Sequence, residues 1–398
     1  MYLYSRTVVL GLFTALVVGM PYAALAAGDT LEVSGWMPYW RHHEAIKDAE
    51  RHDEVIDTVF PFVYVGQQDG SIKDMAAMSD KKWKAFMKNM KAADIEVVPT
   101  IMWSDGYATH QILSNEKTRA KHIANIHKLV DSHGYDGIDI DYENKRHETK
   151  EYFSLFLKEL KAKLGKGKIL SCTVEPRTPP DSLYKEVPDE IKYSNDYDAI
   201  AKYCDRVQIM AYDQQRADLK LNESKAGQPY FPVSDADWVR KVVKYTIKDI
   251  PKEKVVLGIP SYGYHYTVTT APNWYRDYTR IGALNVPDIL DVAKEYKVKP
   301  SRNRAGEMGY TYLPKGSKVK FPKNLKIPND TTPGMKVAAQ ALAYANKTGK
   351  EVQFRFVSYS DAEAMKQKID IAKEFGLKGV ALFKIDGEED KNVWKYLK

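Results

Sequence analysis

Eight short apolar, β-rich segments alternate with helical patterns along this 398-residue chain, and this alternation restricts its fold more than any other feature. The segments lie at residues 31–40, 57–65, 95–103, 135–143, 168–176, 205–213, 254–263 and 378–386. Between them, apolar side chains recur at helical spacing, most clearly in residues 79–93, 117–131 and 360–375. Strands that alternate with helices form parallel sheets covered on both faces. We therefore predict an α/β fold.

Eight such units are the number that closes a (β/α)₈ TIM barrel. The alternative is an open, doubly wound sheet. That fold often carries a G-x-G-x-x-G turn after its first strand, and none follows residues 31–40 here. The sequence thus favours the closed barrel.

The interval between the seventh predicted strand and the last predicted helix is too long to be a simple loop. Loops longer than about 12–15 residues usually have structure of their own. We predict a small α+β insertion subdomain over residues 264–356, between strands seven and eight. The catalytic barrel would then consist of residues 27–263 and 357–398.

The first 26 residues have the layout of a secretory signal peptide. Arg6 precedes an apolar run at residues 7–20, and the small-residue site Ala-Leu-Ala follows at 24–26. The run is short for a membrane span, so we expect cleavage after Ala26 rather than an uncleaved anchor. The mature chain would be secreted, periplasmic or associated with the cell wall.

The net charge of the chain excludes few kinds of binding partner. Cleavage would remove one Arg and no acid, so the formal charge would fall from +7 to +6. This balance is compatible with an anionic polymer, but ordinary solubility is the simpler interpretation. No basic run is dense enough to indicate nucleic acid. We expect a monomer without a nucleic-acid partner and, after cleavage, without membrane association.

The two cysteines are Cys172, within the strand-like "ILSCTV", and Cys204, at the end of a helical pattern. Secretion would permit a disulfide, but these positions favour two buried free thiols. Neither cysteines nor histidines occur at the spacing of a metal site. We expect no metal and no other cofactor.

The segment "DGIDIDYEN" at residues 136–144 combines a strand-like pattern with four acids. Residues two apart in a strand point the same way, so Asp139, Asp141 and Glu143 share one face. In a barrel this face points into the lumen, because the other face must meet the helices. Those outward side chains are Ile138, Ile140 and Tyr142.

Carboxyls stacked about 6.6–7 Å apart inside a barrel are costly to ionise together, so proton sharing is expected. Glu143 lies last, at the C-terminal end of the strand, where barrel enzymes carry their chemistry. A rim acid held protonated by its neighbours suits general-acid cleavage of a glycosidic bond. The alternative is a structural polar network. Asp136 falls outside the alternation, and we expect it to be structural.

"DGIDIDYE" resembles the D-x-x-D-x-D-x-E signature of glycoside hydrolase family 18, the chitinase-like enzymes, and all four acids match. "QIMAYD" resembles the M-x-Y-D motif on the sixth strand of that family, which gives Met210, Tyr212 and Asp213. "KVVLGIPSYGY" and "GLKGVALFKIDGEED" resemble its seventh and eighth strands. The resemblance covers nearly all of the mature chain, and many members carry an α+β insertion at the same place.

The resemblance implies retaining, substrate-assisted hydrolysis of β-1,4-linked N-acetylglucosamine polymers. The 2-acetamido oxygen of the sugar attacks the anomeric carbon, while Glu143 protonates the leaving oxygen and later activates water. Asp141 would bind the acetamido N–H, and Asp139 would partner Asp141 from below. Tyr212 would donate to the acetamido carbonyl, and strand parity places Tyr212 and Met210 on the lumen face.

The chain departs from the family at the end of the eighth strand. The family usually has a Trp there, beneath the distorted sugar, whereas the sequence places Phe383 at this position. Phe keeps an apolar face but is smaller, which puts the fit of a standard chitin chain in doubt. Parity points the next residue, Lys384, away from the site, where it would be solvated or paired.

Aromatic side chains near other strand ends are candidate sugar platforms. Trp103 is the strongest candidate because it ends the third predicted strand, before the loop "SDGYA". The others are Tyr39, Trp40, Tyr64 and Tyr262.

These observations favour an exported glycosidase. A catalytically weak or inactive lectin-like member of the family is the alternative, but the chain retains Glu143. The substrate stays open between chitin, peptidoglycan and N-glycans. Phe383, the compact insertion and the opening "PYW…DTVFPFVYVGQQDGSI" resemble the bacterial branch associated with peptidoglycan and spore-wall hydrolysis.

Overall fold

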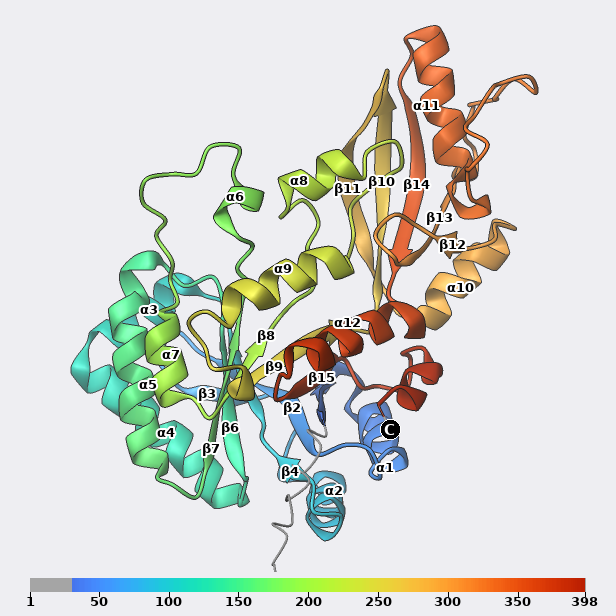
Figure 1. The fold of residues 1–398 in the computed structure, drawn as a ribbon. Helices are drawn as coiled ribbons and strands as arrows, with labels where there is room; N and C mark the ends of the chain where they lie inside the picture. The colour runs from blue at the N-terminus through green and yellow to red at the C-terminus, as the bar shows by residue number, and fades with distance from the viewer. Residues whose placement is uncertain (1–30, 398) are drawn as a thin grey trace, which may run out of the picture. The chain divides into compact units, whose positions relative to one another are not determined.

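The computed structural model describes residues 31–397, so the predicted signal peptide lies outside the described residues. Parallel strands form a closed wall in the order β1-β15-β9-β8-β7-β6-β5-β2, and β1 also pairs with β2. This pairing confirms the predicted (β/α)₈ barrel (Figure 1). The wall strands are β1 (Glu32–Pro38), β2 (Thr58–Gly66), β5 (Thr100–Trp103), β6 (Gly137–Tyr142), β7 (Ile169–Val174), β8 (Arg206–Ile209), β9 (Val255–Pro260) and β15 (Gly379–Phe383).

The third predicted strand is split into β4 (Glu96–Val97) and β5. Pro99 lies at the break, where it has no N–H to donate to a neighbouring strand. Its carbonyl still accepts from the N–H of Asp139 at 2.9 Å. A short additional strand, β3 (Ile72–Asp74), pairs antiparallel with β2.

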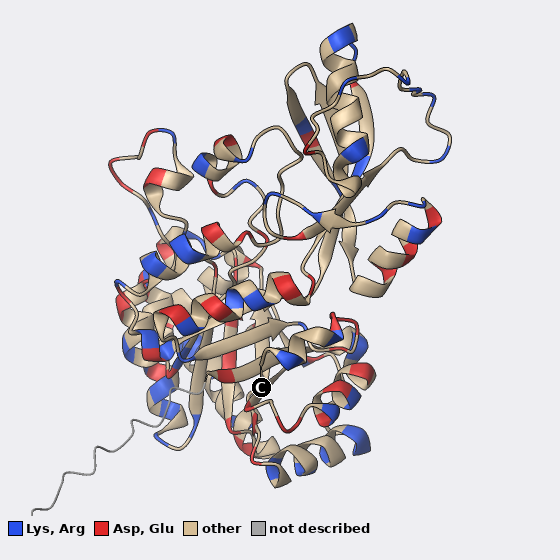
Figure 2. Ribbon diagram, turned by 45° about the vertical axis from the view of Figure 1, so that its right-hand side comes forward, with Lys and Arg blue, Asp and Glu red and all other residues tan. Residues whose placement is uncertain are grey.

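Helices surround the barrel wall and bury apolar side chains against it (Figure 1). In α2, Asp80 caps the first turn by accepting from the N–H groups of Lys82 and Trp83. Lys/Arg and Asp/Glu are interspersed on the helices (Figure 2). The helices of this part are α1 (His42–Arg51), α2 (Lys81–Ala92), α3 (Gly106–Ser114), α4 (Glu116–His133), α5 (Lys150–Leu164), α6 (Pro180–Leu183), α7 (Tyr197–Tyr203), α8 (Leu219–Ser224), α9 (Ala236–Thr246) and α12 (Ala362–Phe375).

A second, five-stranded antiparallel sheet lies between β9 and α12 in the chain, in the order β11-β10-β14-β13-β12. Its elements are β10 (Gly263–Ala271), β11 (Trp274–Leu284), α10 (Val286–Glu295), β12 (Ser301–Arg302), β13 (Met308–Tyr312), α11 (Lys336–Thr348) and β14 (Val352–Tyr359). We call this part the insertion. Helix α11 contacts β10, β13 and β14 of the sheet.

Short 3₁₀ helices complete the described elements. They are η1 (Tyr39–Arg41), η2 (His147–Thr149), η3 (Lys252–Lys254), η4 (Pro333–Met335) and η5 (Lys391–Lys395). Across residues 31–397, no helix has the length and apolar character needed to cross a bilayer.

Cys172 and Cys204 form a disulfide, so the expectation of two free thiols was wrong. Cys172 lies in β7, and Cys204 directly follows α7, which leads into the neighbouring strand β8. The N–H of Asp205 binds the carbonyl of Leu170 at 2.8 Å. This pairing brings the two Cα atoms to 6.0 Å, within the usual range for a bridge. Sequence position alone does not reveal this adjacency.

We predict that the disulfide stabilises the barrel. The two cysteines are 32 residues apart, a separation for which loop closure in the unfolded chain corresponds to about 3–4 kcal/mol. Replacing both cysteines by Ala should lower the free energy of unfolding by a similar amount, measured by urea denaturation. Thiol titration of the unfolded, unreduced protein should detect no free thiol. Two titratable thiols would contradict the bridge.

Candidate active site

The predicted column of acids lies in the barrel lumen, on strand β6. Asp139 is fully buried and accepts hydrogen bonds from two hydroxyls on the flanking strands, Thr100 on β5 at 2.9 Å and Thr173 on β7 at 3.0 Å. Burial raises the pKa of Asp139, while these hydrogen bonds oppose the rise. The lower end of the column is therefore held in place by both neighbouring strands.

Asp141 lies one pleat above Asp139 and is 3% exposed. Its Oδ1 atom is buried without a hydrogen-bond partner in the described part of the chain. Burial, followed by the charge of Glu143, raises the pKa of Asp141 well above its usual value. An unpartnered buried carboxylate oxygen is costly, so this atom is available to a ligand that donates a hydrogen bond.

Glu143 directly follows β6, and its N–H binds the carbonyl of Trp103 at 2.9 Å. Its side chain is half-buried and lines a cavity. Burial raises the pKa of Glu143, the charges of Glu175 and Asp213 raise it further, and Lys145 opposes them. Glu143 is thus held in the protonated form above the pH at which a solvated glutamate ionises, as a general acid requires.

The cavity beside Glu143 has a volume of about 440 Å³. Its walls combine the carboxyls with several aromatic rings, an arrangement typical of small-ligand sites. It is lined by Trp36, Trp40, Phe62, Asp141, Glu143, Thr173, Met210, Tyr212, Asp213, Tyr262, Tyr264, Arg280, Ala283, Asn285, Asp288, Phe383 and Lys384.

Three of these residues come from the "QIMAYD" motif, although β8 ends at Ile209. Beyond the strand, the N–H of Tyr212 binds the carbonyl of Met210 at 2.7 Å, so strand parity does not apply there. The chain nevertheless turns Met210, Tyr212 and Asp213 towards the cavity. Asp213 accepts from the hydroxyls of Tyr262 at 2.6 Å and Tyr264 at 2.7 Å.

Phe383 ends β15 and forms part of the apolar wall of the cavity. Its ring stacks on Tyr212 at 5.5 Å and meets Trp36 edge-on at 5.8 Å. Lys384 also lines the cavity, so its predicted outward direction was wrong. The strand ends at Phe383, and parity therefore does not extend to the next residue. Lys384 is paired, through its ammonium group, with Asp386.

Trp103 and Tyr39 do not line this cavity, so the structure does not support them as platforms there. The indole of Trp103 is 2% exposed and meets Tyr142 edge-on at 5.4 Å. It packs against Gly66, where an added Cβ would lie 2.5 Å from the ring. Tyr39 packs on Trp40 at 5.0 Å. Trp40 is 50% exposed and does line the cavity.

Several charged and polar residues in or near the site were not predicted from the sequence. Glu175 follows β7 just as Glu143 follows β6, so the strand-end rule could have indicated it. Lys145 is buried although it lies in a polar stretch. Arg280, Asn285 and Asp288 reach the cavity from the insertion, and no sequence signal links such distant residues to the barrel rim.

Asp136 connects two neighbouring strands of the barrel. Its carboxylate accepts from the N–H of Val97 at 2.8 Å, which ties the start of β6 to β4. Within the described residues, no group of histidine, cysteine and acidic side chains could hold a metal ion.

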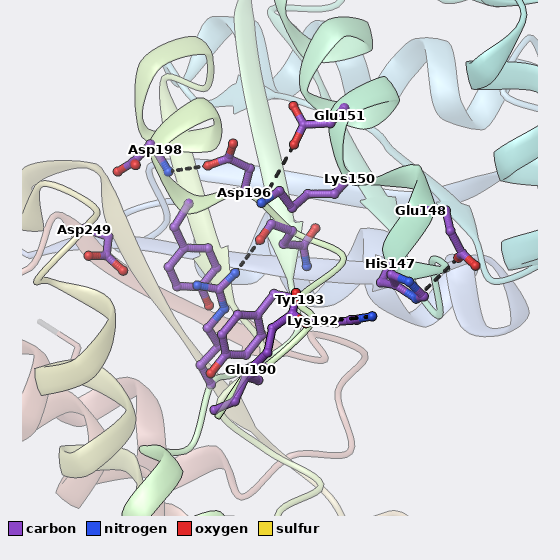
Figure 3. A pocket seen from close by; sticks show the side chains of 14 residues that line it. His147, Glu148, Lys150, Glu151, Glu190, Lys192, Tyr193, Asp196, Asp198 and Asp249 are labelled. Atoms are coloured by element: carbon purple, nitrogen blue, oxygen red, sulfur yellow. Dashed lines mark hydrogen bonds and ion pairs between the residues drawn. The ribbon is translucent and has the colours of Figure 1, made fainter. Parts of the chain in front are cut away.

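A second cavity of about 510 Å³ lies beside α5 and α7 (Figure 3). Its lining is charged, and the guanidinium of Arg177 lies between the rings of Tyr193 and Tyr197 at 3.8 and 3.6 Å. None of the strand-end acids lines it. We therefore assign the candidate chemistry to the cavity at Glu143.

A closed (β/α)₈ barrel with stacked lumen carboxyls, a rim glutamate and an aromatic cavity has the layout of a barrel protein whose site lies at the C-terminal ends of the strands. The chain belongs to glycoside hydrolase family 18. The model of this family, described as "Glycosyl hydrolases family 18", matches residues 34–388.

Individual relatives agree with this assignment. The uncharacterized glycosylase YvbX of Bacillus subtilis (strain 168) is 24% identical over 376 residues, covering 93% of this chain and 88% of the relative. The cortical fragment-lytic enzyme of Bacillus anthracis is 28% identical over 158 residues, covering 40% of this chain and 34% of that protein.

Solved structures share the fold. The spore cortex-lytic enzyme SleL of Bacillus cereus matches with a TM-score of 0.65 and 19% identity, covering 92% of this chain and 73% of that one. The class V chitinase of Pseudomonas fluorescens Pf-5 matches with a TM-score of 0.67 and 20% identity, covering 92% and 98%.

We predict that Asp141→Asn stabilises the fold at neutral pH. The pKa of Asp141 is higher in the folded state than in the unfolded state. The protonated Asp141 side chain therefore favours folding at a pH below its unfolded-state pKa, and this stabilisation is lost as pH rises through the folded-state pKa. Asn cannot ionise, so the variant does not lose this stability at neutral pH. Its Tm should exceed that of the wild type by a few degrees, at roughly 2–4 °C per kcal/mol, and this difference in Tm should shrink in acid. The exposed Asp53→Asn serves as control, and a lower Tm for Asp141→Asn at neutral pH would contradict the argument.

Proposed function

We propose that this chain is an exported glycosidase that hydrolyses β-1,4-linked N-acetylglucosamine-containing polysaccharide with retention of anomeric configuration. One observation carries the proposal. Glu143, with a pKa raised by burial, shares one cavity with Asp141, whose Oδ1 lacks a partner among the described residues, and with Tyr212. An acid, a hydrogen-bond acceptor and a phenol thus converge on one small volume.

In the proposed mechanism, the sugar lies over the apolar wall at Phe383. Glu143 donates its proton to the leaving glycosidic oxygen as the acetamido oxygen of the substrate attacks the anomeric carbon. Asp141 accepts from the acetamido N–H and balances the positive charge that develops on the ring. Glu143, now ionised, takes a proton from the water that opens the intermediate.

Tyr212 supports this arrangement. Burial, and then the charge of Asp141, raises the pKa of Tyr212 well above its usual value, so the phenol keeps its proton. Its hydroxyl can therefore donate to the acetamido carbonyl. Stacking on Phe383 fixes the ring direction. Below Asp141 in the lumen, Asp139 is itself held by the hydroxyls of Thr100 on β5 and Thr173 on β7.

The substrate is proposed from the relatives and from the site. Enzymes named for cortical fragments and for chitin both occur among them, and both names fit polymers that contain N-acetylglucosamine. Phe383 in place of the larger Trp favours the bacterial branch of the family that is associated with peptidoglycan and spore-wall hydrolysis. Export is proposed from the N-terminal pattern and is consistent with the buried disulfide, since such bonds persist in oxidising compartments.

Product analysis by mass spectrometry tests this proposal. The purified protein is incubated with chitin oligomers, peptidoglycan and a high-mannose glycopeptide. Release of fragments that end in reducing N-acetylglucosamine from either of the first two would support it. Binding without any product would favour the lectin-like alternative, and cleavage of the glycopeptide alone would overturn the substrate class.

We predict that Glu143→Gln removes activity but not the fold. Gln has the same shape and cannot supply a proton, and general acid–base catalysis typically contributes a factor of about 10²–10⁴. The rate of product release from N-acetylglucosamine oligomers should fall by at least that factor, while Tm is maintained. Glu151→Gln, an exposed change on α5, is the matched control. Wild-type turnover in Glu143→Gln would disprove the assignment of the acid.

We predict that Tyr212→Phe lowers kcat by about 10²-fold, in the range for loss of one donor at a developing charge. The ring and its stacking on Phe383 are kept, so KM should change little. Steady-state kinetics on a soluble N-acetylglucosamine oligomer measures both. An unchanged kcat would place the phenol outside the reaction.

A further inference from the structure

Two charged side chains beside Glu143 have no part in the proposed mechanism. Lys145 follows the acid by two residues and is only 6% exposed. Its ammonium group donates to the carbonyl of Tyr142 and lies 4.5 Å from the centre of the Phe153 ring. The charges that act on it are those of the carboxylates of Glu175, Asp141 and Glu143. Burying a cation is costly, so these surrounding charges matter to its presence there.

The second side chain, Glu175, lies just beyond β7 and is held at both oxygens. Oε1 accepts from the N–H of Asn144 at 3.1 Å, which is the residue after Glu143. Oε2 accepts from the side-chain amide of Asn195 at 2.8 Å. Asn195 is itself buried. Glu175 therefore ties the loop after β6 to the loop after β7 and brings a fixed negative charge to the catalytic rim.

We propose that Lys145 and Glu175 are positioning residues that act as an opposed pair of charges behind Glu143 and Asp141, setting the pH range in which one proton is shared between these two acids. The proposal rests on the proposed function. Neither side chain lines the catalytic cavity, so both act through the acids and not on the substrate.

The charges surrounding the acids come from several elements. Glu143 is faced by Glu175 from the end of β7, by Lys145 from its own loop and by Asp213 from the turn after β8. Asp141 is acted on by Glu143, Asp139, Glu175 and Lys145. On both acids Glu175 raises the pKa and Lys145 lowers it.

Burial lowers the pKa of Lys145, and the charges of Glu175, Asp141 and Glu143 oppose this. The carboxylates thus help to keep Lys145 charged, while the charge of Lys145 favours the ionised form of Asp141 and Glu143. Without the lysine, ionising either acid in this buried site would be more costly. Without Glu175, the proton on Glu143 would be released at lower pH.

Opposite shifts of the pH–rate profile test the proposal. Activity requires one acid ionised and the other protonated, so the profile on a chromogenic di-N-acetylchitobioside should be bell-shaped. Lys145→Met should move both limbs to higher pH by about 0.5–1 unit, because an attractive charge is removed. Glu175→Gln should move both limbs to lower pH by a similar amount. In the double variant the shifts should largely cancel.

The exposed pair Glu190 and Lys192, 3.9 Å apart beside the second cavity, supplies matched controls (Figure 3). Glu190→Gln and Lys192→Met should leave both limbs in place. A purely structural role for Lys145 or Glu175 would lower kcat or Tm without moving the limbs. Limbs that stay in place, or that move in the same direction in both variants, would overturn the proposal.

A direct titration separates this inference from the proposed function. Carboxyl ¹³C NMR of the wild type and both variants follows the Asp141–Glu143 pair without any turnover. If the wild type cleaves no substrate, the proposed function fails, yet opposite shifts in this titration would still support the inference. Unchanged titration of the pair in folded Lys145→Met and Glu175→Gln would reject it.

Discussion

The stacking of carboxyls inside the lumen is the constraint on which the site depends. Asp139 is fully buried, and the hydroxyls of Thr100 and Thr173 offset part of its desolvation from the two neighbouring strands. Asp141 receives no such help at Oδ1. Burial raises the pKa of Asp139, Asp141 and Glu143, and the charges of Glu143 and Asp139 raise that of Asp141 further. A closed wall is needed for this effect, because an open sheet would admit water to the column.

The cavity above the column is completed by parts that lie far apart in the chain. Phe383 closes it from the last strand, Tyr212 from the turn after β8, and Arg280 from the insertion. Asp213 receives two tyrosine hydroxyls, which fixes the turn that directs Tyr212. The barrel thus supplies the carboxyls of the site, while the insertion supplies one wall of the cavity.

Much of this architecture was predictable from sequence, because it depends on local periodicity. The eight wall strands and the acid column of β6 follow from alternation and strand ends, whereas the cavity residues of "QIMAYD" were indicated by the resemblance to the family motif. The predicted outward direction of Lys384 was wrong, because Lys384 lies beyond the end of β15, where parity no longer governs direction. Trp103 ends a strand but packs on Gly66, a tertiary contact that no local pattern records. The Cys172–Cys204 bridge and the buried Lys145 likewise depend on neighbours distant in sequence or on packing.

The stereochemistry of the first product tests the central claim most directly. If Glu143 acts as acid while Asp141 orients the acetamido group of the substrate, water must enter from the face that the leaving group vacated. Proton NMR during hydrolysis of an N-acetylglucosamine oligomer should then detect the β-anomer first, followed by slow mutarotation. Initial appearance of the α-anomer would require water as the direct nucleophile and would contradict the arrangement derived from this site.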